Sequence, residues 1–151
     1  VLGRARIGVL AGAVPEMLID GVITRHEVQP PSAENAGTLV VTGEDLGVLL
    51  DLEERNAAFE NQSDSVIAGQ VLQRYARLGV VPSITDTDER PSVVQRVPRQ
   101  AETDLSFLQR LAARNGFVFF FEPASFGVSR AWFGPPRRGA RLPELRQRGL
   151  A

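Results

Sequence analysis

The chain has 151 residues, of which 43% are hydrophobic and 23% are charged, and its formal net charge is −1 at pH 7. This composition is ordinary for a globular protein with room for one sizeable domain or two small ones. The absence of cysteine and the single histidine exclude disulfides and multi-histidine or thiolate metal sites, and no apolar run reaches the roughly 20 residues that span a bilayer.

The charge is distributed unevenly along the chain. Every basic residue is an arginine, and eleven arginines accompany seventeen acidic residues up to Glu122. From Pro123 onward, six arginines accompany a single acidic residue, Glu144. We therefore expect an acidic body followed by a basic linker or tail at residues 134–151. An acidic body argues against specific nucleic-acid binding.

The first 43 residues predict a β-rich segment. Asp20-Gly21 lies within the apolar stretch from Glu16 to Gln29, where it favours either a hairpin turn or a bulge in a continuous strand. Gly43 is expected to end the strand before it. Strands are expected at residues 4–10, 16–29 and 38–42, and a loop at residues 30–37.

Residues 44–79 predict a pair of helices. Thr42 followed by Asp45 resembles a capping box, so a first helix is expected from about Glu44 to Phe59. Ser63 and Asp64 supply the second helix start. The apolar stripe that follows ends at Gly79 and consists of Val66, Ile67, Val71, Leu72, Tyr75 and Leu78.

Residues 80–133 predict a second segment with both strands and a helix. Thr103 suits an N-cap and Asn115-Gly116 a helix stop, which predicts a third helix between them. The run Phe117 to Phe121 shows no alternation, so we expect a strand buried on both faces, by its own chain or by a partner. Further extended segments are expected at residues 80–85, 92–97 and 127–133. The interface candidates are Phe117, Phe119, Phe120, Phe121 and Trp132.

Three blocks of the chain resemble a known family. The first is Thr-Asp-Leu-x-Phe-Leu-x-Arg-Leu-Ala-x-x-Asn-Gly-Phe-x-Phe-Phe at residues 103–120, preceded by Gln100. The others are residues 38–54 and 64–76, the latter followed by Pro82. In this order they resemble phage late control protein D and the baseplate hub proteins of contractile tails. They are also similar to the VgrG spike proteins of type VI secretion.

The resemblance implies a structural role and an α+β fold with antiparallel, barrel-like hub segments. It divides the chain into a β-rich segment at 1–43, a helical pair at 44–79, a second α+β segment at 80–133 and a tail at 134–151. It implies a homotrimeric hub that joins the tail tube to a central spike and contacts baseplate wedge proteins. Such a particle component is assembled in the cytoplasm. The chain is short for a complete hub and has no spike repeat, so spike function is not expected.

The main alternative is a tail-associated peptidoglycan-degrading enzyme. Glu44-Asp45 and the acidic residues from Asp51 to Glu54 supply the carboxylates that glycoside hydrolysis needs. The first pair also suits the first turn of a helix and the second an exposed face. His26 has no accompanying nucleophile motif. We therefore expect no catalytic, cofactor or metal site and no membrane anchor.

Two other patterns in the sequence resemble ligand-binding loops only in part. Residues 85–89 resemble a calcium loop in charge only, because the central glycine of such a loop is missing. The glycines near the start lack the lysine of a phosphate-binding loop, since the chain has no lysine. A small adaptor that binds an extended peptide at a free sheet edge is the third interpretation.

Overall fold

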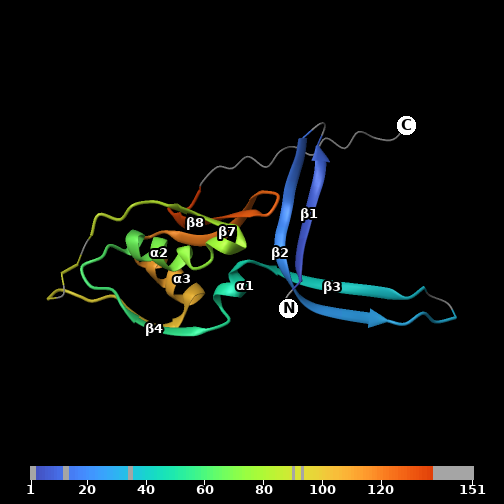
Figure 1. Cartoon of the computed structure of the whole chain (residues 1–151), viewed down its shortest axis with the longest axis horizontal. Coiled ribbons are helices and arrows are strands. Elements are labelled where there is room, and N and C mark those ends of the chain that lie inside the picture. The colour runs from blue at the N-terminus through green and yellow to red at the C-terminus, as the bar shows by residue number, and fades with distance from the viewer. Residues whose placement is uncertain (1–2, 12–13, 34–35, 90, 93, 138–151) are drawn as a thin grey trace.

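Three antiparallel strands project from a mixed α and β body in the computed structural model, which describes residues 3–11, 14–33, 36–89, 91–92 and 94–137 (Figure 1). β1 (Arg4–Ala11), β2 (Val14–Gln29) and β3 (Thr38–Asp45) form one sheet in the order β1-β2-β3. β2 pairs with β1 through its first half and with β3 through its second half. The two pairs diverge as ribbons, which we name the β1 arm (β1 with residues 14–22) and the β3 arm (β3 with residues 21–29).

β2 runs through Asp20-Gly21 without a turn, so the strand interpretation is confirmed and no hairpin forms there. Irregular pairing occurs on either side of the dipeptide, opposite Ile7 and Gly8 of β1 and between Ile23 and Arg25. Gly21 is required for a different reason: a Cβ at this position would clash with the carbonyl oxygen of Glu44 on β3. The dipeptide therefore marks the point where β2 leaves one partner and meets the other.

The described part of the body contains two further sheets, three α-helices and one 3-10 turn. Its elements are α1 (Gly47–Leu50), β4 (Glu54–Ala58), α2 (Asp64–Gln73), the 3-10 turn η1 (Ala76–Leu78), β5 (Val80–Ile84), β6 (Arg99–Thr103), α3 (Asp104–Arg114), β7 (Val118–Ser125) and β8 (Val128–Gly134). β4 and β6 form an antiparallel pair, whereas the third sheet has the order β5-β8-β7. β5 runs parallel to β8, which corrects the expectation of purely antiparallel sheets. The fold is α+β, and no closed barrel forms among the described residues.

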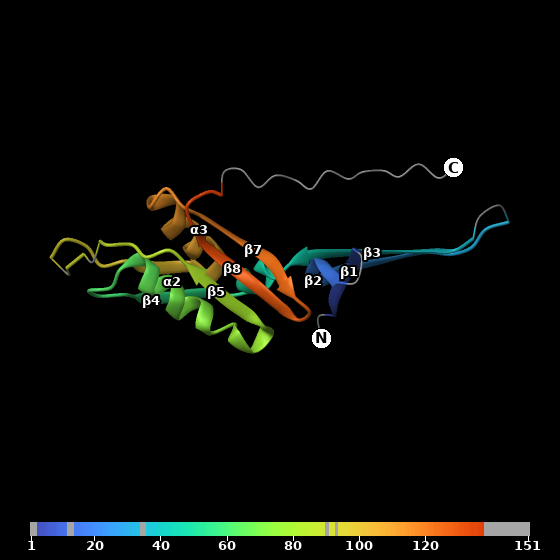
Figure 2. The same cartoon turned by 90° about the horizontal axis from the view of Figure 1, so that it is seen from above.

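The core lies between α2, α3 and the β5-β8-β7 sheet (Figure 2). Phe107 of α3 stacks on Phe59 with ring centroids 5.5 Å apart, and Phe133 of β8 packs edge-on against Phe117. The helices contribute the fully buried side chains Ile67, Ala68, Val71, Leu72, Phe107, Leu108, Leu111 and Ala112. Burial of such side chains contributes about 1.5–3 kcal/mol each, which is what holds the helices on the sheet.

Both of these helices begin where the sequence predicts. The Ser63 hydroxyl accepts from the backbone N–H of Val66 at 3.4 Å, and the Thr103 hydroxyl accepts from that of Ser106 at 3.3 Å. α3 ends at Asn115, and Gly116 follows with a φ of 68°, a left-handed conformation that favours glycine. The predicted cap and stop of the third helix are therefore confirmed.

The helix expected from Glu44 to Phe59 is wrong. β3 continues through Gly43 to Asp45, whose carboxylate accepts from the N–H of Gly47 at 2.7 Å and starts a helix of one turn, α1. The chain then becomes β4, in which Arg55 lies opposite Glu102 of β6. That partner is 47 residues further along, so local periodicity cannot reveal it. Long-range pairing has overridden the local helix signal.

The extended segment expected at residues 92–97 is also wrong in its described part. The carbonyl of Ser92 accepts from the N–H groups of Gln95 and Arg96, both at 2.9 Å, which closes a turn. The strand begins two residues later, at Arg99. The strands expected at 4–10, 38–42, 80–85 and 127–133 are confirmed as β1, β3, β5 and β8. Of the predicted tail, residues 138–151 lie outside the described residues.

Candidate assembly surface

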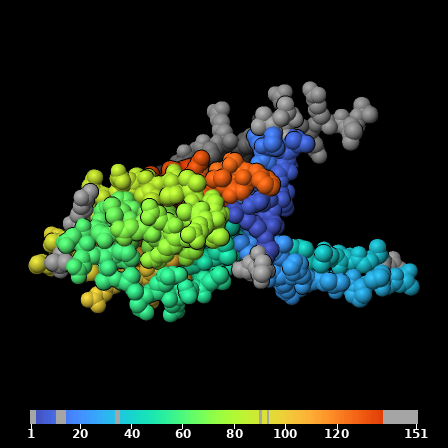
Figure 3. All heavy atoms as spheres, in the orientation of Figure 1, coloured from blue at the N-terminus to red at the C-terminus, as the bar shows by residue number. Residues whose placement is uncertain are grey.

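The two arms extend from the body as ribbons of two strands each. Every residue of β3 is exposed, and the space-filling view shows the β3 arm standing clear of the body (Figure 3). Among the described residues, neither β1 nor β3 has a strand partner on its outer edge. An isolated pair of strands is at best marginally stable in water. Neither face of such a pair is covered, and each outer edge leaves backbone N–H and C=O groups without partners.

Both arms also expose apolar side chains. Leu10 near the end of β1 is 80% exposed and Val28 on the β3 arm is 75% exposed. Together the arms carry nine large exposed apolar residues, namely Ile7, Val9, Leu10, Leu18, Ile19, Val28, Leu39, Val40 and Val41. So many large exposed apolar side chains on two projecting ribbons are typical of an interaction site.

A buried carboxylate fixes the arms to the body at the point where they meet. Asp20 of β2 accepts from Arg4 Nε at 2.6 Å and Nη2 at 2.5 Å, and from the Ser129 hydroxyl of β8 at 2.9 Å. Arg6 approaches the same carboxylate at 3.4 Å. Burial alone raises the pKa of Asp20, but these hydrogen bonds and the two guanidinium charges outweigh it. The pKa of Asp20 is therefore lowered from its ordinary value.

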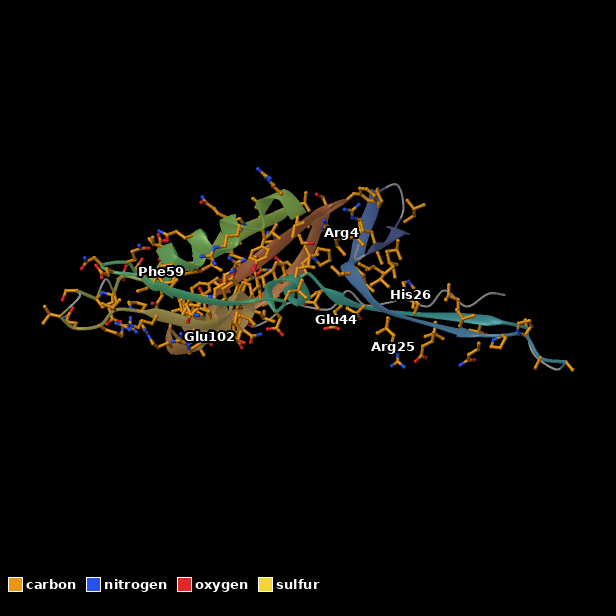
Figure 4. All side chains as sticks on the ribbon, turned by 60° about the horizontal axis from the view of Figure 1, so that its bottom comes forward. Arg4, Arg25, His26, Glu44, Phe59 and Glu102 are labelled. Carbon is orange, nitrogen blue, oxygen red and sulfur yellow. The ribbon has the colours of Figure 1, made fainter. Side chains whose placement is uncertain are left out.

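The same cluster ties three elements together. Arg4 Nη1 donates to the carbonyl of Leu78 in η1 at 2.6 Å, so one side chain links β1, β2 and the turn after α2. Figure 4 shows Arg4 at this junction, whereas Arg25 points outward from the β3 arm. Within the described ranges, Arg25 pairs with the exposed Glu27 on its own strand. The junction is therefore held by buried charge. Beyond it the β1 arm also contacts the turn between β7 and β8, where the Arg6 guanidinium lies 4.8 Å from the ring centre of Phe126.

The aromatic strand has two different faces. Phe119 and Phe121 pack together edge-to-face at 5.5 Å and lie against the core with Phe117, so these three are half-buried by their own chain. Phe120 remains 36% exposed and meets the half-buried Trp132 at 6.5 Å on the outer face of β7 and β8. The five interface candidates are thus divided between the core and this outer pair. Burial of the outer pair by a second subunit stays a prediction.

The candidate acidic residues do not gather into a site. Glu44 and Asp45 end β3. The Asp51 carboxylate accepts from the Thr103 hydroxyl at 2.6 Å, and Glu53 pairs with Arg55. His26 lies opposite Val41 on the exposed β3 arm. No cluster of three histidine, cysteine, aspartate or glutamate residues suited to a metal occurs in the part of the chain that the structure describes. None of the helices described there is long and apolar enough to cross a membrane.

Sequence reasoning did not identify the Arg4–Asp20–Ser129 cluster. Its one signal is an aspartate inside an apolar strand, together with arginines at alternate positions of the preceding strand. Alternation places Arg4 and Arg6 on one face of β1, but the register that sets them against Asp20 is a property of the folded sheet. The sequence predicts the three strands, but not that they leave the body as exposed apolar arms.

Comparisons with known proteins identify the family of the chain. The family model described as "Phage tail baseplate hub (GPD)" matches residues 5–145. No curated protein sequence matches the chain. A crystal structure of the tail protein from Neisseria meningitidis MC58 has a similar fold, with a TM-score of 0.50 and 16% sequence identity. The likeness covers 78% of this chain but only 35% of that protein, so this chain spans about a third of its length. The family match over nearly the whole chain shows that it belongs to the phage tail baseplate hub (GPD) family, a family of structural tail components.

Proposed function

We propose that this chain is a structural, non-catalytic subunit of a baseplate hub that joins the tail tube to the central spike of a contractile phage tail or a related injection particle. The observation that carries the proposal is the pair of open-edged arms with nine exposed apolar side chains. Such arms gain stability when another subunit supplies the missing strands and covers their faces.

A closed ring is the assembly that best suits these arms. In a cyclic assembly every subunit covers the same surface of its neighbour, so no apolar face or open edge remains exposed. We propose a homotrimer that contacts the tube, spike and baseplate wedge proteins. It assembles in the cytoplasm before it joins the particle. We also propose that the chain is related to the VgrG spike proteins of type VI secretion.

Imaging of intact particles tests this function most directly. The chain should form a threefold layer between tube and spike, with the β1 and β3 arms at the boundaries between its copies. A layer of different symmetry would contradict the trimer, and a position away from the tube–spike junction would contradict the hub role. Hydrolysis of cell-wall material by the purified chain would support the enzyme alternative instead.

A pair of matched variants tests the role of the arms. Leu39→Glu places a charge on the β3 arm, and Leu52→Glu places the same charge on a body residue that is also exposed outside the arms. Leu39→Glu should abolish incorporation into particles without lowering the melting temperature of the isolated chain. Leu52→Glu should leave incorporation unchanged. Equal incorporation of both variants would show that the arms are not part of the assembly surface.

The open sheet edges also favour a second function, that of an adaptor which pairs with an extended peptide from another protein. The two functions differ in the number of copies that assemble together. A hub subunit gives a fixed copy number in the purified particle, whereas an adaptor binds one peptide for each chain and forms no ring. Mass measurement of the complex isolated from particles distinguishes them.

A further inference from the structure

β7 is an edge strand of the body, and the side of it that faces away from β8 has no strand partner among the described residues. Hydrogen bonds on the far side of β8 show which backbone groups of the sheet are already used. The N–H of Ser129 donates to the carbonyl of Gly79 at 2.9 Å, and the carbonyl of Phe133 accepts from the N–H of Thr85 at 2.8 Å. The odd-numbered residues of β8 therefore direct their backbone groups toward β5, and the even-numbered residues direct theirs toward β7.

The same alternation identifies the unpaired backbone groups of β7. Trp132 of β8 lies opposite Phe120, so Phe120 directs its backbone groups toward β8. Its neighbours Phe119 and Phe121 direct their N–H and C=O groups to the open edge, where no hydrogen bond from another described residue reaches them. Pro123 fits this pattern, because proline lacks the N–H that would point outward there. β7 therefore offers a short row of free donors and acceptors to an added strand.

Two cavities follow this open edge. One of about 620 Å³ lies between the arms and β7, and one of about 200 Å³ lies between α1, α3 and β7. Residues 119–121 line the smaller cavity and residues 121–123 line the larger one. Side chains of a strand alternate between its two faces, so a cavity that consecutive residues line runs along the backbone edge. The residues of this edge span about 17 Å, which is the length of an ordinary strand.

The walls of the two cavities combine apolar and acidic side chains. Ile19 and Val41 line the larger cavity, and Val48 and Leu105 line the smaller one. The described residues that line them include no arginine or histidine but five carboxylates, namely Asp20, Glu44, Asp45, Asp51 and Glu122. Asp20 and Glu122 pair with arginines outside the cavities, whereas the other three are exposed and form no ion pair within the described ranges. The charge of these walls complements a partner that carries arginine or lysine.

We propose that an extended segment of another protein, in which apolar residues alternate with arginine or lysine, adds to the open edge of β7 as a fourth strand of the β5-β8-β7 sheet. Its backbone pairs with Phe119 and Phe121, and its apolar side chains cover the walls of the cavities. Its basic side chains pair with Asp51 and with Glu44, which lies where the β3 arm leaves the body (Figure 4). Strand addition at β7 rests on the adaptor function proposed above, for which it selects one edge and one class of ligand. The hub assembly does not depend on it.

A synthetic peptide of about six alternating arginine and leucine residues, titrated calorimetrically into the full chain, tests the site. Replacing its arginines with glutamate should weaken binding at least about tenfold, because like charges then meet at the walls. N-methylation of its central residues keeps the side chains and the charge but removes N–H donors, and it should also weaken binding at least about tenfold. Binding that survives N-methylation would show that the peptide does not bind as a strand. No binding at about 1 mM peptide would overturn the site.

Two charge-matched variants test the acidic walls. Glu44→Gln with Asp51→Asn removes two carboxylates from the walls, and Glu60→Gln with Asp88→Asn removes two exposed carboxylates that line neither cavity. The first variant should bind the arginine–leucine peptide about fivefold more weakly, as expected for the loss of two exposed ion pairs. The second variant should bind it within about twofold of the native affinity. Equal effects would mean that net charge alone attracts the peptide and would contradict the proposed pairing.

The absence of native cysteine allows the bound peptide to be located. Gln109→Cys places a thiol beside the smaller cavity, and Val66→Cys places a control thiol on α2 away from both cavities. Peptide at about ten times its Kd should slow alkylation at position 109 about tenfold and leave the rate at position 66 within about twofold. If bound peptide leaves both rates unchanged, it lies at another edge, such as that of β1 or β3. Strand addition at β7 is then wrong and the adaptor function stands. Slow alkylation at position 109 that needs no peptide and disappears on dilution would assign the edge to a second copy and overturn the proposal.

Discussion

Arg4 and Asp20 form a two-pronged ion pair, with Nε–Oδ1 and Nη2–Oδ2 distances of 2.6 and 2.5 Å, at the point where β2 passes from the β1 arm to the β3 arm. The carboxylate is fully buried, and Ser129 of β8 supplies a further hydrogen bond. This pair is therefore the main polar attachment of the arms to the body.

Replacing Asp20 with asparagine should lower the free energy of unfolding by about 3–5 kcal/mol, because it leaves the Arg4 guanidinium without its buried partner. Urea unfolding followed by Trp132 fluorescence measures the change. Arg25→Met is the control: it breaks the exposed pair with Glu27 on the same strand and should cost about 0–1 kcal/mol. A similar loss for both variants would mean that the buried pair has no special role.

The same carboxylate should make the junction sensitive to acid. Since the pKa of Asp20 is lowered in the folded state, its ionised form stabilises the fold above the unfolded pKa of about 3.9, and that contribution is lost as the pH falls through the folded pKa. The difference in urea midpoint between the native chain and Asp20→Asn should therefore be constant from pH 5 to 7 and shrink below about pH 4. A difference that stays constant to the lowest pH at which the chain folds would contradict the shift.

Tyr75 offers a spectroscopic test of the body, because it is the sole tyrosine. Burial raises its pKa, and so do the 2.8 Å hydrogen bond to Asp104 and the charge of that carboxylate. The folded chain should show no phenolate absorbance near pH 10, where the unfolded chain is about half ionised. Absorbance titration in buffer and in urea makes the comparison. Half-ionisation of the folded chain at pH 10 would show that the Asp104 contact is not kept in solution.

Two glycine-to-alanine variants should have opposite effects. Gly116 has a left-handed φ with no atom near its missing Cβ, so Gly116→Ala should cost about 1–2 kcal/mol through backbone strain alone. Gly69 lies inside α2, where an added Cβ would meet Ile84 at an ordinary 3.6 Å, so Gly69→Ala should gain about 0.5–1 kcal/mol. Thermal unfolding measures both. Effects of equal sign would contradict the helix stop at Gly116.

The two faces of β7 predict two kinds of failure. Phe119→Glu puts a charge against the core and should prevent folding. Phe120→Glu changes the exposed outer pair with Trp132 and should leave the isolated chain folded but block incorporation into particles. Circular dichroism and particle assembly separate the two effects. Normal assembly of Phe120→Glu would show that the outer face is not a subunit contact.

Local signals in the sequence determined a definite part of this protein. Ser63, Thr103 and Gly116 marked helix boundaries that the structure reproduces, since caps and left-handed stops depend on a few neighbouring residues. The three blocks at residues 38–54, 64–76 and 103–120 indicated the hub family, which the match over residues 5–145 confirms. Phe119 and Phe121 of β7 pack against the core, whereas the expected burial of the opposite face, which carries Phe120, stays a prediction.

The tertiary structure decided what long-range contacts control. Residues 54–58 have helix-compatible periodicity but form β4, because β6 offers strand pairing nearly fifty positions away. Asp20 is an isolated acidic residue in the sequence and becomes the junction only when the register of β1 brings Arg4 to it and β8 brings Ser129. Strand register and partner choice depend on residues distant in the chain, whereas helix caps depend on neighbours. That difference in range is why the sequence predicted the start of α2 and both ends of α3 correctly and left the arms and their junction to the fold.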